Sequence, residues 1–249
     1  MTIQVHFPST WYGWTTPECT LSPAFTTPDH GYYVPDKSTT VIVDPKTTAD
    51  YHSDSPVFRA YFLRPNGSTS VVLKFAMRDD LIDTLVEEAN VYTGQLESLQ
   101  GAAIPRYYGL YAGTLNGQTV ACLMLEYCGE CLRRPFDRLS VDLRLRILHQ
   151  LREIHKCGFI HGDFAERNVL EKNGDIRIID FDQTIRHDCN CRLDFRPGEK
   201  LLDSSQVGCE QLWEVYRYRM RLITPSELKD SVTLSSQNPV LMRSPRVAA

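Results

Sequence analysis

The fold of this chain can be worked out from one stretch, HGDFAERNVL, residues 161–170. The stretch places a histidine, two acids, an arginine and an asparagine within eight residues and then continues into apolar Val169 and Leu170. Asp163 and Asn168 lie five residues apart, so a single loop offers a carboxylate and an amide oxygen. Taken alone, the stretch fits a polar turn between a helix and a strand as well as a loop built for chemistry. The surrounding elements therefore have to decide between the two.

Helices and hairpins are predicted on both sides of this stretch. Apolar residues at spacings of three and four predict helices over residues 79–100, 140–157 and 209–223, the second beginning at the candidate N-cap Ser140. Asn-Gly pairs flanked by strand-like runs predict hairpins, because a type I′ turn needs positive φ at both central positions. The pairs are Asn66-Gly67, Asn116-Gly117 and Asn173-Gly174. This order predicts a β-rich part followed by a helical part, with residues 161–170 between a helix and the third hairpin.

Composition and charge exclude several classes of protein. The 249 residues are 42% hydrophobic and 23% charged, which is typical of a soluble globular protein. A formal net charge of -4 gives no reason to expect binding to nucleic acid or to an anionic membrane. No apolar run approaches the roughly 20 residues of a membrane-spanning helix. The N-terminus lacks a basic start followed by an apolar block, so a cytoplasmic or nuclear location is expected.

The eight cysteines are expected to be free thiols in a reducing compartment. Cys128 and Cys131 form a CxxC, while Cys189 and Cys191 lie two apart beside His187. A zinc site joining the two pairs is the less favoured interpretation, because the second pair lacks the two-residue gap of zinc knuckles.

Several separated motifs resemble those of protein kinases. HGDFAERNV resembles the catalytic loop His-x-Asp-x-x-x-x-Asn, and IIDFD resembles the Asp-Phe-Gly element, with Asp180 in the acid position. VVLKFA resembles the strand whose lysine holds nucleotide phosphates, which indicates Lys74, and Glu88 follows on the first predicted helix. LMLEYCG resembles the hinge between the two lobes. The resemblance covers roughly residues 53–185, about half of the chain.

The resemblance implies an α+β, two-lobe protein-kinase-like fold. Its antiparallel β-rich N-lobe would span residues 53–128, and a reduced α-helical C-lobe would span residues 129–222. Residues 1–52, rich in Pro, Thr and Ser, are predicted to be an irregular N-terminal arm, and residues 223–249 a flexible C-terminal tail.

The resemblance also implies ATP and Mg²⁺ as cofactors and assigns the site residues. Asp163 would orient the acceptor hydroxyl and take its proton, while Asn168 and Asp180 would supply the hard oxygen ligands that Mg²⁺ prefers. Lys74 would bind the α- and β-phosphates, and Glu88 would hold the Lys74 side chain in place.

The hinge and the catalytic loop supply the other predicted contacts. Glu126 and Cys128 would offer backbone groups to adenine, with Leu125 at the back of the pocket. Arg167 would neutralise the γ-phosphate, or would instead pair with a neighbouring acid such as Asp163. His161 is predicted to be a structural histidine that supports the loop.

Three features depart from the kinase pattern. The segment before residue 57 has no glycine-rich loop, Asp182 stands where a glycine is usual, and only 67 residues follow Asp182. The platform that grips a peptide in ordinary protein kinases is therefore largely absent. A solvated turn residue is the favoured interpretation of Asp182.

The details of the loop leave the acceptor open. His-Gly-Asp resembles small-molecule kinases of the aminoglycoside and choline type as well as RIO-type atypical protein kinases, whereas Asp-Phe-Ala-Glu-Arg-Asn resembles tyrosine kinases. Residues 92–111, YTGQLESLQGAAIPRYYGLY, look most similar to fungal protein-kinase-like proteins. The leading hypothesis is an ATP- and Mg²⁺-dependent phosphotransferase acting on a protein hydroxyl, with an unidentified protein substrate as partner. The alternatives are a pseudokinase that acts as a binding scaffold, and a small-molecule kinase that uses acids of residues 188–214 to bind a cationic acceptor.

Overall fold

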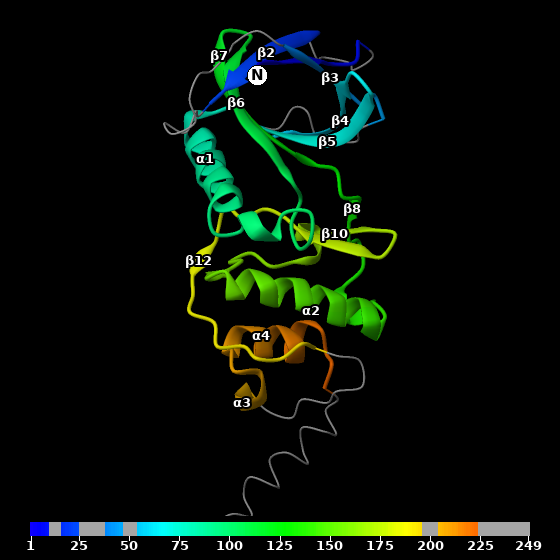
Figure 1. Ribbon diagram of the computed structural model, residues 1–249, viewed down its shortest axis with the longest axis vertical. Coiled ribbons are helices and arrows are strands. Elements are labelled where there is room, and N and C mark those ends of the chain that lie inside the picture. The colour runs from blue at the N-terminus through cyan, green and yellow to red at the C-terminus, as the bar shows by residue number, and fades with distance from the viewer. Residues whose placement is uncertain (10–15, 25–37, 47–53, 196–203, 224–249) are drawn as a thin grey trace, which may run out of the picture.

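The structure, a computed structural model, describes residues 1–9, 16–24, 38–46, 54–195 and 204–223. A β-barrel occupies one end of the molecule, and the helices α2 and α4 lie at the other (Figure 1). The described part of the chain is thus a mixed α/β structure with a β-rich sheet and few helices, which is compatible with the predicted fold class.

Seven strands of the described residues close the barrel in the order β1-β2-β6-β7-β5-β4-β3. They are β1 (Ile3–His6), β2 (Glu18–Pro23), β3 (Thr39–Val43), β4 (Val57–Arg64), β5 (Gly67–Ala76), β6 (Tyr107–Leu115) and β7 (Gln118–Glu126). Neighbouring strands are antiparallel except β1 and β3, which are parallel. The interior is apolar, and its aromatic core is formed by Phe7, Phe58 and Phe75, whose ring centroids lie 5.6 to 6.1 Å apart.

The prediction of an irregular arm over residues 1–52 is wrong for the described part of that segment. Three strands, β1, β2 and β3, lie within it and complete the barrel. Each strand buries alternate residues, as Ile3 and Val5 show in β1. These strands are short, so their alternation is easily missed among Pro, Thr and Ser residues. Pairing with β4 and β6 satisfies backbone groups that an open sheet would leave at its two edges.

The first helix is shorter than predicted, and the second agrees with prediction. α1 (Asp79–Thr93) ends where the Gly94 N–H bonds the Asn90 carbonyl oxygen at 2.9 Å, and a 3₁₀ turn (Glu97–Leu99) follows. Glycine is a poor helix former, and here it ends the predicted 79–100 helix early. α2 (Val141–Lys156) begins at the predicted N-cap, since the Ser140 side chain accepts a hydrogen bond of 3.3 Å from the Leu143 N–H.

The helix predicted over residues 209–223 is present but irregular. α4 (Glu210–Glu214) continues as a π-helical turn (Val215–Arg219), and α3 (Ser204–Val207) precedes it. Leu212, Tyr216 and Met220 are buried as predicted, whereas Val215 is only half-buried. The C-terminal tail predicted over residues 223–249 lies, apart from Ile223, outside the described residues.

Two small sheets carry the HGDFAERNVL stretch. One has the order β11-β10-β8, with β8 (Glu130–Cys131), β10 (Val169–Lys172) and β11 (Asp175–Ile178), and the other pairs β9 (Phe159–Ile160) with β12 (Ile185–Arg186). The stretch itself runs from the end of β9 through a 3₁₀ turn (Glu166–Asn168) into β10. A further 3₁₀ turn (Phe136–Arg138) precedes α2.

All three predicted hairpins form, but only two use the predicted turn. Asn116 and Gly117 have φ of 52° and 82°, and Asn173 and Gly174 have φ of 54° and 89°. In the β4–β5 hairpin, Arg64 pairs with Gly67, so the two loop residues are Pro65 and Asn66. Proline holds φ near −65°, so a type I′ turn cannot form there.

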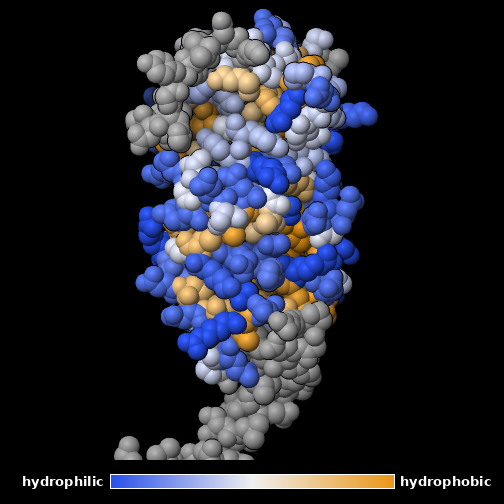
Figure 2. Space-filling view, viewed as in Figure 1, coloured by the Kyte–Doolittle hydropathy of each residue, from blue (hydrophilic) through white to orange (hydrophobic). Residues whose placement is uncertain are grey.

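A second apolar core lies between α1, α2, α4 and the small sheets, and it includes Tyr92, Phe136, Ile147 and Trp213. On the face shown in Figure 2, apolar side chains of the described residues gather in separate groups between hydrophilic ones. Among the described helices, none combines the length and apolar character that crossing a membrane requires.

Candidate active site

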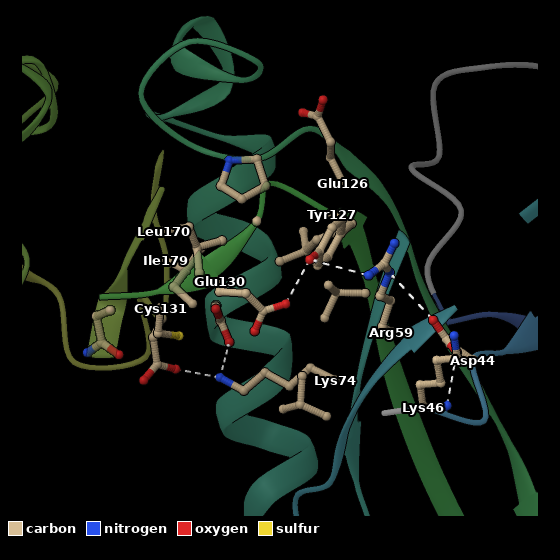
Figure 3. A pocket seen from close by; sticks show the side chains of 18 residues that line it. Asp44, Lys46, Arg59, Lys74, Glu126, Tyr127, Glu130, Cys131, Leu170 and Ile179 are labelled. Carbon is tan, nitrogen blue, oxygen red and sulfur yellow. Dashed lines mark hydrogen bonds and ion pairs between the residues drawn. The ribbon is translucent and has the colours of Figure 1, made fainter. Parts of the chain in front are cut away.

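A pocket of about 550 Å³ lies between the barrel and the small β11-β10-β8 sheet. Lys74, Glu88, Asn168 and Asp180 line it, together with residues of β4, of β8 and of the segment after β7 (Figure 3). Ligand pockets for small molecules have volumes of about 300–1,000 Å³. Four residues that the sequence predicts to act together therefore meet in one cavity of a size that suits a small ligand.

Lys74 links three elements inside this pocket. It projects from β5, and its Nζ lies 2.8 Å from Oε2 of Glu88 on α1 and 2.6 Å from Oδ1 of Asp180, which follows β11. Burial by itself lowers the pKa of the Lys74 ammonium, but the Glu88 and Asp180 carboxylates outweigh burial and raise this pKa above its usual value. Lys74 is thus held as a cation that points into the cavity.

Glu88 connects α1 to the Asp180-Phe181 segment. Its side chain is 2% exposed, and its second carboxylate oxygen accepts a 3.4 Å hydrogen bond from the Phe181 N–H. Burial raises the pKa of the Glu88 carboxyl above its ordinary value, and the neighbouring Lys74 ammonium offsets only part of this shift. Phe181 packs edge-to-face on Tyr92 of α1, with ring centroids 5.3 Å apart, so packing and hydrogen bonding together fix the segment.

Asp180 and Asn168 lie side by side at the open end of the β10–β11 hairpin. The Ile179 N–H bonds the Asn168 carbonyl oxygen at 3.0 Å, and Asp180 has a φ of 72°, which L-residues rarely adopt. Strained backbone of this kind is concentrated at functional sites. The Asn168 amide nitrogen donates to the Asp163 carbonyl oxygen at 2.9 Å, which leaves the amide oxygen as the atom that can face the cavity. A carboxylate and an amide oxygen at one wall of a pocket fit the ligand preference of Mg²⁺.

Asp163 lies beside this pocket rather than in its lining. Both carboxylate oxygens of Asp163 accept hydrogen bonds of 2.6 Å from Arg167, and the Asn168 amide nitrogen lies 3.2 Å from one of them. The Arg167 hydrogen bonds hold the pKa of the Asp163 carboxyl below its ordinary value, so the group is ionised at neutral pH. Arg167 was predicted to contact either the γ-phosphate or a neighbouring acid, and the structure shows it paired with the acid Asp163.

His161 is a structural residue that supports the loop, as predicted. Its side chain is fully buried, and Nε2 donates a 2.8 Å hydrogen bond to the Ile179 carbonyl oxygen. Burial lowers the pKa of the imidazole, so the ring is neutral at neutral pH. The contact joins the start of the HGDFAERNVL stretch to the residue that precedes Asp180.

Gly162 allows the loop to approach the segment after Asp180. Its φ is 77°, and a Cβ at this position would overlap the carbonyl oxygen of Gln183. We expect Gly162→Ala to lower the free energy of unfolding by several kcal/mol, because the left-handed conformation costs roughly 1–2 kcal/mol and the overlap adds to it. Gly117→Ala is the matched control, since its φ is 82° and a Cβ there meets nothing within 4 Å. Denaturant unfolding of both variants measures the difference, and equal losses would contradict the close approach.

The predicted hinge residues divide into two groups. Leu125 and Glu126 line the pocket, whereas Cys128 does not. Tyr127 and Cys131 line it instead, because the chain turns after β7 and brings β8 to the cavity wall. Cys128 is not among the residues that line the pocket, and the backbone contact predicted between Cys128 and adenine stays a prediction.

Sequence reasoning missed a polar group at the barrel side of the pocket. Lys46 and Asp44 follow β3, and Arg59 lies on β4, with its guanidinium 4.2 Å from the Tyr127 ring centroid. The Tyr127 hydroxyl donates to Glu130 at 2.7 Å (Figure 3). The sequence did not assign Asp44 and Lys46 to the pocket, because both lie within the segment predicted to be irregular.

The segment expected to replace the glycine-rich loop is only partly described, since residues 47–53 fall outside the described residues. Asp54 forms an ion pair of 3.2 Å with Arg78 and is not among the residues that line the pocket. Arg78 thus compensates the negative charge of Asp54. Asp182 is half-buried, and burial together with the nearby Asp180 raises the pKa of its carboxyl.

Comparisons with known proteins match the same region. A family model described as "RIO domain" matches residues 137–195, which contain HGDFAERNVL and Asp180. The chain is also similar to "KEOPS complex subunit Bud32" of Pyrococcus abyssi (strain GE5 / Orsay), with 30% identity over 64 residues. That match covers 24% of this chain and 29% of the archaeal protein, so the chain spans less than a third of that relative. The predicted resemblance to the protein-kinase-like superfamily is confirmed over this segment, and the predicted fungal character stays a prediction.

Proposed function

We propose that this chain, with its RIO-like segment over residues 137–195, is an ATP- and Mg²⁺-dependent phosphotransferase that transfers the γ-phosphate of ATP to a hydroxyl group on a protein. The observation that carries the proposal is the contact of Lys74 with both Glu88 and Asp180, at 2.8 and 2.6 Å, in a pocket that Asn168 also lines. Phosphoryl transfer depends mainly on positioning and charge neutralisation, and this arrangement supplies a cation and oxygen ligands together.

Each residue then has a distinct role in the proposal. Lys74 binds nucleotide phosphates, and Glu88 positions Lys74 from the core. Asp180 and Asn168 hold Mg²⁺, which neutralises charge on the phosphates when it is bound. Asp163 orients the acceptor hydroxyl and accepts its proton late in the transfer, and Arg167 sets the position of the Asp163 carboxylate.

The same proposal includes a two-lobe arrangement. The barrel with α1 corresponds to an N-lobe over residues 53–128, extended by the N-terminal strands, and the helices correspond to a reduced C-lobe over residues 129–222. The barrel interior has an apolar core of its own, which supports a separate N-lobe, whereas the second core joins α1 and β7 to the C-terminal helices and connects the two parts. Leu125 and Glu126 would contact adenine where the two parts join.

A protein acceptor fits the described residues better than a cationic small molecule. Asp194, one of the acids considered for binding a cation, forms an ion pair of 2.8 Å with Arg152. Glu199 and Asp203 lie outside the described residues. The Pyrococcus abyssi relative is a subunit of the KEOPS complex, which supports protein partners for this chain as well. A cytoplasmic or nuclear location stays part of the proposal.

Incubating the purified full chain with radiolabelled ATP, Mg²⁺ and a panel of protein substrates tests this function. We expect labelled protein, or release of labelled phosphate, that requires Mg²⁺ and stops on addition of EDTA. A parallel thermal-shift titration should show an increase in melting temperature of about 5–10 °C when Mg·ATP is present at about 100 times its Kd. A thermal shift without turnover would favour a pseudokinase scaffold. The absence of both the shift and the turnover would contradict nucleotide binding.

A further inference from the structure

Two histidines and two cysteines lie close together among the C-terminal elements, and none of the four lines the pocket. They are His155 at the end of α2, His187 and Cys189 after β12, and Cys209 at the N-cap of α4. One nitrogen or sulfur atom from each lies within 4.8 Å of the corresponding atoms of the other three. Figure 1 shows α2 above α4, with the chain after β12 running down to α4.

The distances match those of a tetrahedral metal site. The Cys209 sulfur lies 3.6 Å from Nδ1 of His155 and 3.4 Å from Nε2 of His187. In a tetrahedral zinc site, Zn–S bonds of about 2.3 Å and Zn–N bonds of about 2.0–2.1 Å separate sulfur from nitrogen by about 3.6 Å. The two sulfur–nitrogen distances of Cys209 thus match edges of such a tetrahedron, and all four ligand atoms lie within 4.8 Å of one another.

Four polar groups surround the Cys209 sulfur. It faces two imidazole rings, the Cys189 thiol and, at 3.7 Å, the side-chain oxygen of Gln211. Without a metal, the thiol donates its proton to one neighbour and accepts weakly from N–H or S–H groups, so the groups are linked in pairs. A cation at the centre would contact both sulfurs and both nitrogens at once.

We propose that His155, His187, Cys189 and Cys209 bind one Zn²⁺ ion in a closed, four-ligand structural site. Thiolate and imidazole ligands in tetrahedral array select zinc over Mg²⁺, which prefers oxygen. Each thiol releases its proton to solvent on binding. The proposal is independent of phosphate transfer, because none of the four residues belongs to the phosphotransfer site.

The neighbouring backbone is shaped to hold these residues together. Gly208 has a φ of 74°, and a Cβ there would lie 2.7 Å from the Asn190 carbonyl oxygen, so glycine allows the α4 end to approach the segment after β12. The His187 N–H bonds the Gly158 carbonyl oxygen at 3.0 Å and ties that segment to the end of α2. A zinc ion would cross-link three segments that are distant in sequence and hold α4 against α2.

This site differs from the one considered on sequence grounds. Cys189 is a member, but Cys128, Cys131 and Cys191 are not. The CxxC pair lies near the pocket instead, with Cys131 in β8. The spacing of cysteines along the chain indicated a site made of two cysteine pairs. In the structure, two histidines from different elements lie beside two cysteines instead.

Metal analysis of the full chain, produced in medium with added zinc and purified under reducing conditions, tests the proposal. We expect about one zinc per wild-type chain by plasma mass spectrometry. Cys189→Ser and Cys209→Ser should each reduce bound zinc to near zero. Cys191→Ser, a buried cysteine two residues from Cys189, is the matched control and should keep the zinc content of the wild type.

A second measurement on the wild type covers the case in which a serine variant fails to fold. The chain is stripped with a chelator and titrated with Co²⁺, and a tetrahedral site with two thiolates should give the cobalt–thiolate charge-transfer band at one equivalent. Addition of Zn²⁺ should remove the band. Wild-type chain without bound zinc and without this band, a metal-free Cys189–Cys209 disulfide, or unchanged zinc in both serine variants would overturn the proposal.

Discussion

Asp163→Ala is expected to reduce phosphate transfer by roughly 10²–10⁴-fold, because the carboxylate that receives the acceptor proton is lost. The fold and the affinity for Mg·ATP should stay close to those of the wild type. Asp163 is not part of the pocket lining, and its contacts with Arg167 are partly exposed, so their loss costs about 1 kcal/mol or less. Initial-rate measurements with radiolabelled ATP, combined with a thermal-shift titration, separate the two effects.

Two further variants sharpen this test. Asp163→Asn retains a side chain of the same shape that can still contact Arg167, yet it cannot act as a base, so it should be as inactive as Asp163→Ala. Asp175→Ala removes an exposed acid of β11 outside the pocket and should transfer phosphate at the wild-type rate. Transfer by Asp163→Ala at the wild-type rate would show that Asp163 is not the base.

Lys74→Met is expected to destabilise the chain by about 3–5 kcal/mol and to remove its stabilisation by Mg·ATP. The substitution leaves the Glu88 carboxylate, 2% exposed, without the ammonium at 2.8 Å, and an uncompensated buried charge is costly. It also removes the cation that faces the pocket. Denaturant unfolding gives the first quantity, and melting temperatures with and without Mg·ATP give the second.

A double substitution separates stability from nucleotide binding. Replacing a buried ion pair by apolar side chains of similar volume is often neutral, so Lys74→Met with Glu88→Met should recover most of the lost stability. The response to Mg·ATP should stay absent in the double variant. Lys156→Met is the matched control, because Lys156 forms an exposed ion pair of 3.4 Å with Glu153 and its loss should cost about 1 kcal/mol or less. A full Mg·ATP response in Lys74→Met would contradict the role assigned to this lysine.

The sequence was informative wherever a signal is local. Ser140 could be identified as an N-cap, and the Asn116-Gly117 and Asn173-Gly174 turns followed from the rarity of positive φ outside glycine and asparagine. The type I′ turn predicted at Asn66-Gly67 does not form, and the reason is also local. The loop residues are Pro65 and Asn66, and Pro65 cannot adopt the positive φ that such a turn needs. The end of α1 at Gly94 was missed, because the predicted helix continued through this glycine to residue 100.

Contacts between distant segments were harder to predict from the sequence. Closure of the barrel depends on the parallel pairing of β1 with β3, which no short-range pattern reveals. Lys46 reaches the pocket only because β3 is placed in that barrel. For Arg167 the sequence left open the γ-phosphate and two neighbouring acids, Glu166 and Asp163, and the fold of the loop brings Arg167 to Asp163.

The sequence alone was enough to nominate Lys74, Glu88, Asn168 and Asp180, because they stand in motifs that resemble those of protein kinases and are residue types that suit phosphate chemistry. Their convergence around one cavity is a property of the tertiary structure. So is the meeting of His155, His187, Cys189 and Cys209, whose separations along the chain follow no familiar spacing. Periodicity and turn chemistry act over a few residues, whereas a pocket or a ligand tetrahedron is set by how whole elements pack.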